Sequence, residues 1–196
     1  MTNRLVLASG SPRRRELLAS IGATFDVSPA DVDETGHDGE RPLAYVERIA
    51  TTKALAVVAR THGPELGGVA VLAADTTVDL DGEILAKPLD DDDARRMLRR
   101  LSGRTHLVHT AVFGWTAHGP HAVTVTTEVT FSPLAEADID WYLSMGEHLD
   151  KAGAYGMQGA GGALVHRIDG SPSNVVGLPL AETIAVLRAC GVTVAG

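Results

Sequence analysis

The first apolar run of the chain, Leu5-Val6-Leu7-Ala8, is followed directly by the small polar residues Ser9-Gly10-Ser11. A short apolar run that ends in a turn signal predicts a buried strand entering a tight loop. Pro12 suits the first position of a helix, and Ser11 suits the cap before it. Apolar residues then recur at helical spacing up to Gly22, which predicts a helix that ends there.

A second set of apolar residues at helical spacing predicts a helix over residues 41–60. Its stripe consists of Leu43, Val46, Ile49, Ala50, Ala54, Val57 and Val58. Lys53 falls on the same stripe, where a core helix is normally apolar. A lysine there either extends its ammonium group to solvent or faces a cleft, and the pattern alone favours the first.

Strand and turn signals alternate in the middle of the chain. Val69–Ala74 is apolar throughout and continues into Asp75-Thr76-Thr77-Val78, which predicts a buried strand. Asp81-Gly82 predicts a hairpin turn that returns the chain through Glu83-Ile84-Leu85 to Lys87-Pro88.

The rest of the chain adds helices and a long hairpin. A helix is expected from the acidic run Asp90–Asp93 to Gly103, and this run is interpreted as a cap rather than a metal site. His106–Thr116 and His121–Phe131 alternate in polarity and predict a hairpin. Four further elements are expected: a helix around Ile139–Met145, a Gly-rich loop from Gly153 to Gly162, a strand Leu164–Ile168 and a helix after Pro179. Helices interleaved with hairpins predict an α/β (α+β) fold with a mixed sheet.

Length and charge limit the classes of function. The 196 residues suit one domain, or one core divided into two lobes around a cleft, and we expect residues 1–196 to form a single domain. A net charge of -8 argues against a general binder of nucleic acid or anionic membranes. Phosphate chemistry would therefore need locally concentrated positive charge or a metal ion. Arg13-Arg14-Arg15 lies in the electrically balanced part of the chain, residues 1–60.

Other sequence features exclude common alternatives. Cys190 is the single cysteine, so neither an internal disulfide nor a thiolate metal site is expected. The amino-terminal segment does not resemble a signal peptide, and no apolar run approaches the ~20 residues that span a bilayer. The histidines lack zinc-site spacing, and the Walker and dinucleotide-binding glycine motifs are absent from the sequence. We expect a soluble, cytoplasmic protein.

The loop from Ser9 to Arg14 is the first candidate for a functional site. Unpaired N–H groups at a helix N-terminus favour an anion, and arginines there form forked contacts with phosphate oxygens. A solvated basic first turn is the alternative interpretation. For Arg15, a solvated position without a ligand is enough to explain the residue.

Carboxylates supply the second group of candidates. Asp75 follows a buried strand directly, a position where carboxylates often face a site, and Lys87 could return an ammonium group toward it. A carboxylate from Asp31, Asp33 or Glu34 could help to hold Mg²⁺ on a substrate phosphate. For Asp31 and Asp33, an exposed acidic loop is favoured.

The segment Asp150–Gly159 is rich in glycine, which lets the backbone approach a ligand closely. Gln158 in this segment offers both a donor and an acceptor, which suits the edge of a nucleobase. A flexible surface loop is the alternative.

Several segments together resemble the Maf family of nucleoside triphosphate pyrophosphatases, in order and over nearly the whole chain. These segments are Leu7–Arg14 with Glu16-Leu17-Leu18, Ala74-Asp75-Thr76, Lys87-Pro88, Leu101–His106, Asp150–Gly159 and Gly170–Pro179. Two positions depart from the family pattern. Ala86 stands where glycine is usual, and His148 stands where proline is common.

The resemblance implies a two-lobed single-domain α/β fold of the Maf and ITPase-like type, with helices flanking a twisted mixed sheet and a deep nucleotide cleft. It implies hydrolysis of dTTP or UTP, and of modified uridine triphosphates, to the monophosphate and pyrophosphate with Mg²⁺ or Mn²⁺. The segment Asp150–Gly159 is similar to the dTTP/UTP branch. A 7-methyl-GTP-type pyrophosphatase and a nucleotide-binding regulator of septum formation are the alternatives, and a homodimer is consistent with the family.

The resemblance also implies roles for individual residues. It places the proton acceptor at Asp75, which would hold the divalent metal together with Glu34. Selection of the substrate is implied for three residues: Arg13, Thr76 and Gln158. Binding of the phosphates and substrate is implied for four cleft residues: Ser9, Arg14, Lys53 and Lys87.

Overall fold

A computed structural model describes residues 2–61 and 67–194. Its strands form one seven-stranded sheet in the order β2-β1-β3-β5-β6-β7, with β4 paired to β3. The strands are β1 (Arg4–Leu7), β2 (Phe25–Val27), β3 (Val69–Leu80), β4 (Glu83–Leu85), β5 (Thr105–Thr116), β6 (Gly119–Phe131) and β7 (Val165–Asp169). β1 runs parallel to β2 and β3, and the remaining pairs are antiparallel. The predicted mixed α/β fold is confirmed.

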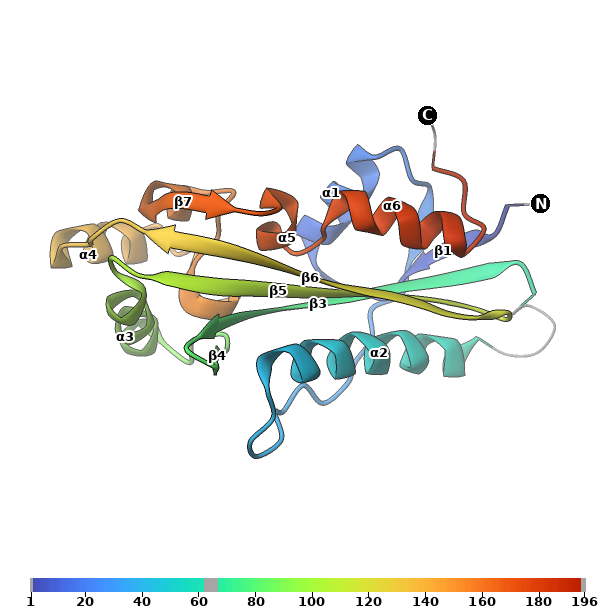
Figure 1. Ribbon diagram of the computed structural model, residues 1–196, viewed down its shortest axis with the longest axis horizontal. Helices are drawn as coiled ribbons and strands as arrows, with labels where there is room; N and C mark the ends of the chain where they lie inside the picture. Colours follow the sequence, from blue (N-terminus) through green and yellow to red (C-terminus); the bar gives the residue numbers. More distant parts are fainter. Residues whose placement is uncertain (1, 62–66, 195–196) are drawn as a thin grey trace.

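Helices cover both faces of the sheet. They are α1 (Pro12–Ser20), α2 (Pro42–Arg60), α3 (Asp91–Leu101), α4 (Glu136–Ser144), α5 (Pro172–Val176) and α6 (Leu180–Ala189), with short 3₁₀ segments η2 (Ala152–Ala154) and η3 (Ala160–Leu164). α2 lies against one face, whereas α1, α5 and α6 lie on the other, and α3 and α4 gather at one end (Figure 1). Within residues 2–61 and 67–194, no helix has the length and apolar character needed to cross a membrane.

Two of the hydrophobic clusters occupy different parts of the long central strands. Leu72 of β3 and Val112 of β5 pack with residues of α1 and α6. Farther along the same strands, Val78 and Val108 pack with residues of α3 and α4. The strands β3, β5 and β6 therefore run through both of these clusters.

Local sequence signals at helix ends and turns are confirmed. The Ser11 side chain caps α1 by accepting a hydrogen bond from the Arg14 N–H at 3.4 Å. Asp90 caps α3 by accepting from the Asp93 N–H at 2.7 Å, as its interpretation as a cap requires. Asp81 and Gly82 both have positive φ, 57° and 87°, which the tight turn between β3 and β4 needs.

Several details differ from the sequence prediction, and the short helix α5 (Pro172–Val176) was not predicted. β2 was not predicted, because a three-residue strand gains its stability from pairing with β1 rather than from its own pattern. The turn between β5 and β6 is shorter than predicted, since Thr116 already pairs with Gly119. Leu43 was placed on the buried stripe of α2 but is 45% exposed, whereas its neighbour Pro42 is buried.

One edge of β3 is open between two partners. The pairing with β1 ends at Leu72, which lies opposite Leu7, and the pairing with β4 begins at Val78. Residues 73–77 therefore have no strand partner along this edge within the described chain. Asp75 and Thr76 lie at the opening, and their side chains point to opposite faces of the sheet because strand residues alternate.

Candidate active site

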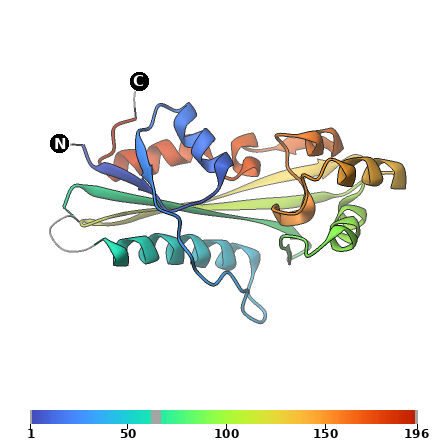
Figure 2. The same cartoon turned by 180° about the vertical axis from the view of Figure 1, so that it is seen from behind.

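A cavity of about 580 Å³ lies at the open edge of β3. It is lined by the loop before α1, by α2, by the connection after β4 and by the segment that follows α4. All nine predicted site residues line it: Ser9, Arg13, Arg14, Glu34, Lys53, Asp75, Thr76, Lys87 and Gln158. Figure 2 shows α1 and the segment around residues 150–164 approaching each other across the middle of the sheet. The fold thus brings together residues that are far apart in the sequence.

Lys53 is the centre of a small charged cluster. Its Nζ atom lies 2.7 Å from Asp75 Oδ1 and 2.8 Å from Glu34 Oε1. Lys53 is 8% exposed and Asp75 is 6% exposed, so this contact is shielded from water. The interpretation that Lys53 extends to solvent is therefore wrong. The helix turns it toward the gap in the sheet, where two carboxylates replace its hydration.

The charges around Glu34 favour its ionised form. Partial burial raises the pKa of this carboxyl, but the hydrogen bond from Lys53 and the charges of Lys53, Lys87 and Arg14 outweigh it and lower the pKa overall. Glu34 is consequently an anion at neutral pH, beside the buried Asp75. Two carboxylates and a lysine thus share one wall of the cavity.

Arg14 is held firmly at the start of α1. Its Nε atom donates to the Gly177 carbonyl at 2.9 Å, its Nη2 atom donates to Thr76 Oγ1 at 3.0 Å and its Nη1 atom donates to Ser9 Oγ at 3.4 Å. Burial lowers the pKa of the guanidinium, and the charge of Asp75 counteracts that shift. Arginine has five N–H donors, so two remain for a ligand after these three contacts.

Arg13 faces the other side of the cleft. Its Nη1 atom lies 3.4 Å from Asp150 Oδ2, and this ion pair joins the start of α1 to the segment that carries Gln158. Both side chains retain exposure to solvent. The sequence pointed to Arg13 as an anion ligand, but the contact with Asp150 could not be read from any local pattern.

The segment around Gln158 is anchored at several points. Tyr142 Oη accepts a hydrogen bond from the Gly156 N–H at 3.2 Å, and Glu147 Oε1 accepts one from the Ala160 N–H at 3.2 Å. Gly153 has φ +69°, and a Cβ atom there would lie 3.0 Å from a methyl group of Val78. Gln158 itself is exposed and lines the cavity.

A buried aromatic cluster anchors this segment to the sheet through Tyr155. His106 Nε2 and Tyr155 Oη are 2.8 Å apart, and both rings pack edge-on with Phe131. Burial lowers the pKa of His106 to about 4, so the imidazole is neutral at neutral pH. Because the ring is neutral, the cluster supports the loop without adding charge to the cavity.

Lys87 lines the cavity from the connection after β4 and is exposed. The Ala86 substitution for the usual glycine does not strain the backbone. Asp81 and Ala154 are the non-glycine residues with positive φ among those described, and Ala86 is not one of them. Alanine is therefore compatible with the presentation of Lys87.

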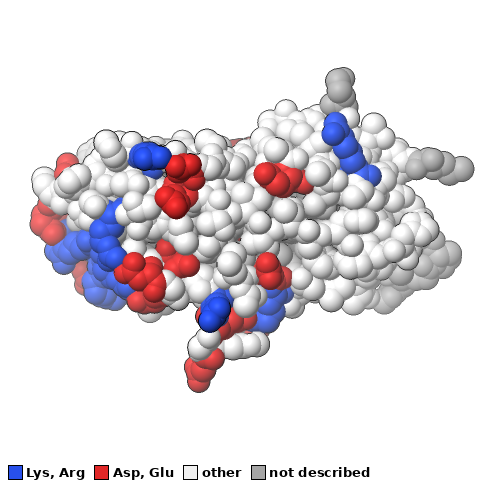
Figure 3. All heavy atoms as spheres, viewed as in Figure 1, with Lys and Arg blue, Asp and Glu red and all other residues white. Residues whose placement is uncertain are grey.

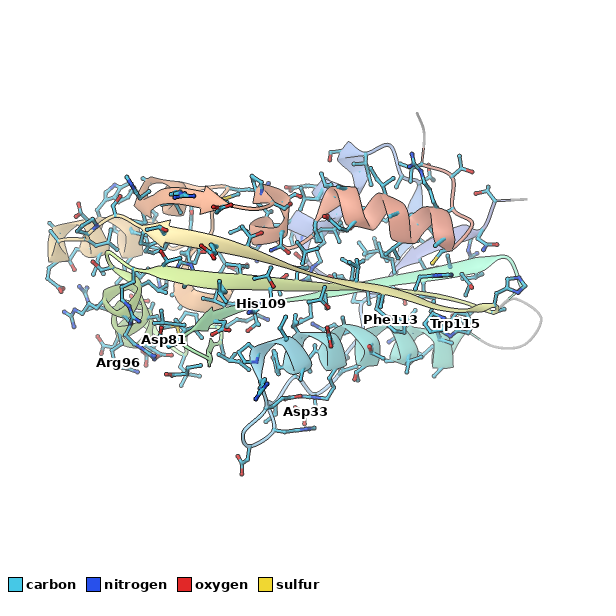
Figure 4. All side chains as sticks on the ribbon, in the orientation of Figure 1. Asp33, Asp81, Arg96, His109, Phe113 and Trp115 are labelled. Atoms are coloured by element: carbon cyan, nitrogen blue, oxygen red, sulfur yellow. The ribbon has the colours of Figure 1, made fainter. Side chains whose placement is uncertain are left out.

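The remaining acidic candidates lie outside the cavity lining. Asp31 and Asp33 are exposed, and Asp33 Oδ1 accepts a hydrogen bond from the Thr35 N–H at 2.8 Å. Figure 4 shows Asp33 on the loop before α2, away from the sheet. These two residues fit the exposed acidic loop that the sequence favoured.

Tyr45 is a cavity residue that sequence reasoning missed. Its hydroxyl donates to the Glu34 carbonyl at 3.0 Å, which ties the Glu34 loop to α2. Burial, together with the charges of Asp75 and Glu34, raises the pKa of Tyr45 to about 12. Its spacing of about two helical turns from Lys53 was the available signal, because such residues share a helix face.

Comparisons with known proteins show which family and which relatives the chain resembles. A family model described as Maf-like protein matches residues 4–190. A dTTP/UTP pyrophosphatase of Anaeromyxobacter dehalogenans is 56% identical over 97% of this chain and 96% of its own length. Proteins of the same name from Myxococcus xanthus and Hahella chejuensis are 54% and 49% identical, over 95% and 97% of this chain and 92% and 94% of their own lengths.

Proposed function

The chain belongs to the Maf family, and we propose that it hydrolyses the α–β phosphoanhydride bond of dTTP or UTP, releasing the nucleoside monophosphate and pyrophosphate. The name of the close relatives supports the reaction and the substrate class. The observation in the structure that carries the proposal is the charged cluster of Lys53, Asp75 and Glu34 beside Arg14 in one cavity. We also propose that residues 1–196 act as one domain whose two cores enclose the cleft.

The triphosphate would bind to the cationic groups of the cavity. Arg14 presents its two remaining N–H donors, and Arg13, Lys53 and Lys87 add positive charge. Ser9 lies at the N-terminal end of α1, where backbone N–H groups favour an anion. Positioned cations of this kind stabilise the oxygens that gain negative charge during phosphoryl transfer.

The carboxylates fit a divalent cation that is shared with the substrate. Asp75 and Glu34 are within 2.7 and 2.8 Å of the same Lys53 ammonium, so the two carboxylates meet at one point of the cavity. No set of three or more His, Cys, Asp or Glu side chains suited to a metal occurs within residues 2–61 and 67–194. Mg²⁺ typically takes one or two carboxylates and completes its shell with water and substrate phosphates. When bound, the cation would neutralise phosphate charge.

Asp75 is the proposed proton acceptor. A water molecule attacks the α-phosphorus. The bond from this phosphorus to the oxygen that bridges the α- and β-phosphates breaks, and pyrophosphate leaves with the bonding electron pair. The proton of the attacking water passes to an Asp75 carboxylate oxygen. Lys53 donates to Oδ1 of Asp75 and keeps that side chain oriented, because the two groups are buried together.

Gln158 and Arg13 are proposed to select the base and sugar end of the substrate. The Gln158 amide can both donate to and accept from the edge of a pyrimidine. Arg13 lies beside the same segment through its contact with Asp150. This arrangement favours a uracil or thymine base over 7-methylguanine, whose larger ring system presents a different edge.

A pyrophosphate-release screen tests the proposal. It covers dTTP, UTP, modified uridine triphosphates, CTP and 7-methyl-GTP, each with Mg²⁺ and with Mn²⁺. We expect the highest kcat/KM for dTTP or UTP, and the screen also determines which cation is used. Preference for 7-methyl-GTP would support the other branch, and no turnover of any nucleotide would refute an enzymatic role. The homodimer, the cytoplasmic location and a role in septum formation stay predictions.

A further inference from the structure

We infer that Thr76 acts on the substrate indirectly, by orienting Arg14, and that the buried Thr110 is the positioning residue that fixes Thr76 for this task. The inference rests on the proposed function and deepens it. It assigns Thr76 to recognition of the triphosphate rather than of the base, and it gives Thr110 a role that its place in the middle of β5 does not suggest.

The hydroxyl of Thr110 has a single possible direction of donation. Its Oγ1 atom lies 2.9 Å from the backbone carbonyl oxygen of Asn174 and 2.9 Å from Thr76 Oγ1. Two oxygen atoms at hydrogen-bond distance need a proton between them. A carbonyl has none to give, so the proton between Thr110 and Asn174 must come from Thr110.

The direction of the next hydrogen bond follows from the first. Thr110 has donated its one proton, so the proton between Thr110 and Thr76 must come from Thr76. Thr76 Oγ1 then meets Arg14 Nη2 at 3.0 Å as an acceptor, which matches the guanidinium, a group that can only donate. The chain of donation therefore runs from Arg14 through Thr76 and Thr110 to Asn174.

This direction leaves Thr76 without a proton to offer to a ligand. Its hydroxyl can still accept, but the base-selecting donor role would require the whole chain to reverse. Reversal is blocked at the Asn174 carbonyl, which cannot donate. Thr76 therefore reaches the substrate through Arg14, whose remaining N–H donors it helps to aim.

The far end of the chain is rigid. Asn174 and Thr110 are both fully buried. The Asn174 Nδ2 group donates to the Val108 carbonyl at 2.9 Å and to Thr127 Oγ1 at 3.0 Å, so α5 is tied to β5 and β6. The Asn174 carbonyl also accepts from the Gly177 N–H at 3.0 Å, and Gly177 supplies the carbonyl that binds Arg14 Nε. Two of the three contacts of Arg14 thus depend on α5 and its C-terminal end.

A double-mutant cycle with inorganic triphosphate tests the inference. Thr110→Val keeps the shape of the side chain and removes the hydroxyl, and the Asn174 carbonyl keeps its bond from Gly177. Calorimetry in the presence of Mg²⁺ would compare the unsubstituted protein, Thr110→Val, Arg14→Met and the double variant. We expect Thr110→Val to weaken triphosphate binding by about five- to tenfold when Arg14 is present and by less than about twofold when it is absent.

Two further variants separate positioning from simple packing. Thr110→Ser retains the hydroxyl and is expected to bind triphosphate within about twofold of the unsubstituted protein. Thr76→Val should repeat the behaviour of Thr110→Val, and it should weaken UTP and CTP by the same factor. It serves as the second test if Thr110→Val does not fold.

Equal losses in the presence and absence of Arg14 would overturn the inference, because Thr110 would then act through packing alone. A Thr76→Val protein that binds triphosphate normally but changes its preference between UTP and CTP would also overturn it. The binding experiment does not depend on turnover. If no nucleotide is hydrolysed while the cycle behaves as expected, the proposed function fails and the coupling of Thr110 to Arg14 stands.

Discussion

The two sides of the cleft hold their functional side chains in different ways. On the β3 side, Arg14, Lys53 and Asp75 are fixed by hydrogen bonds and ion pairs to one another and to rigid elements. On the opposite side, Lys87 and Gln158 are exposed, and within the described residues no side-chain hydrogen bond is found for either. Phosphoryl transfer needs fixed charges, whereas recognition of a base benefits from groups that adjust to the ligand. We therefore assign chemistry to the first side. On the second side we assign selection to Gln158, while Lys87 adds positive charge for the phosphates.

The positive charge outside the cleft follows a third pattern. α3 carries several arginines, and Figure 3 shows blue and red side chains intermixed at that end of the molecule. Arg99 pairs with Glu136 at 2.7 Å, and Arg100 pairs with Glu83 at 2.6 Å. These cations are neutralised by exposed partners, so the net charge of -8 does not conceal a basic nucleic-acid surface on α3. Arg14 instead has no carboxylate partner among the contacts found for it.

The largest effect is expected for Asp75→Asn. The substitution preserves the shape of the side chain and removes the proton acceptor, so kcat should fall by about 10³-fold. Steady-state pyrophosphate release with UTP measures the loss, and circular dichroism checks that the fold is retained. Substantial residual turnover would remove Asp75 from the role of base and would weaken the assignment of chemistry to the β3 side.

Replacement of one lysine from each side sharpens the comparison. Lys53→Met should lower kcat/KM by about 10²-fold and the free energy of unfolding by about 3 kcal/mol, because it leaves the buried Asp75 without its closest partner. Lys87→Met should lower kcat/KM by about tenfold and change the free energy of unfolding by less than about 0.5 kcal/mol, because Lys87 is exposed.

Urea unfolding and UTP kinetics on the two lysine variants give the required values. Equal destabilisation of both variants would contradict the distinction between a fixed and an exposed side of the cleft. A greater loss of activity in Lys87→Met than in Lys53→Met would also contradict this distinction.

The free energy of unfolding should depend on pH through His106, which packs against the Gln158 segment. The pKa of His106 falls from 6.5 to about 4 on folding, because burial disfavours the charged ring. As the pH falls below 6.5, the unfolded chain binds a proton at His106 that the folded protein does not. The stability contributed by neutral His106 is therefore fully present above pH 6.5 and is lost as the pH falls toward 4, by about 3 kcal/mol at most.

His106→Gln removes this titration and keeps a polar partner for Tyr155. The free energy of unfolding, measured with urea across that pH interval, should depend less steeply on pH in the variant. Identical slopes in the two proteins would show that His106 does not couple the segment to pH.

A modest effect, confined to the choice of base, is expected for Gln158→Ala. Removal of the amide should reduce the preference for UTP over CTP by about tenfold, since the loss is one or two hydrogen bonds to the base. Binding of inorganic triphosphate should remain unchanged, because Gln158 is not assigned to the phosphates. Competition between the two nucleotides measures the preference. A loss of triphosphate affinity would contradict the assignment of Gln158 to the base rather than to the phosphates.

The sequence predicted best where local chemistry decides the structure. Ser11, Asp90 and Asp81-Gly82 were interpreted from helix caps and turns, which depend on neighbouring residues. Lys53 was misjudged from its pattern, because its surroundings depend on the gap between β1 and β4. The resemblance placed it in the cleft, where the structure also has it.

Contacts between distant segments were beyond any local pattern. Arg13 and Asp150 are 137 positions apart, and the hydroxyl chain from Thr76 to Asn174 joins β3, β5 and α5. Neither residue type nor spacing signals such a contact, because it is created by the packing of elements that are distant in the sequence. The residue lining of the cavity could be anticipated from the resemblance, but the hydrogen bonds that orient its arginines could not.

The central claim is that the fixed charges of the β3 side direct cleavage to the α–β bond of a pyrimidine nucleotide. Chromatographic analysis of the products formed from UTP by the unsubstituted protein, with Mg²⁺ or Mn²⁺, tests it most directly. The expected result is UMP and pyrophosphate in equal amounts, without UDP. Formation of UDP and orthophosphate, or no turnover of UTP and dTTP with either cation, would contradict it.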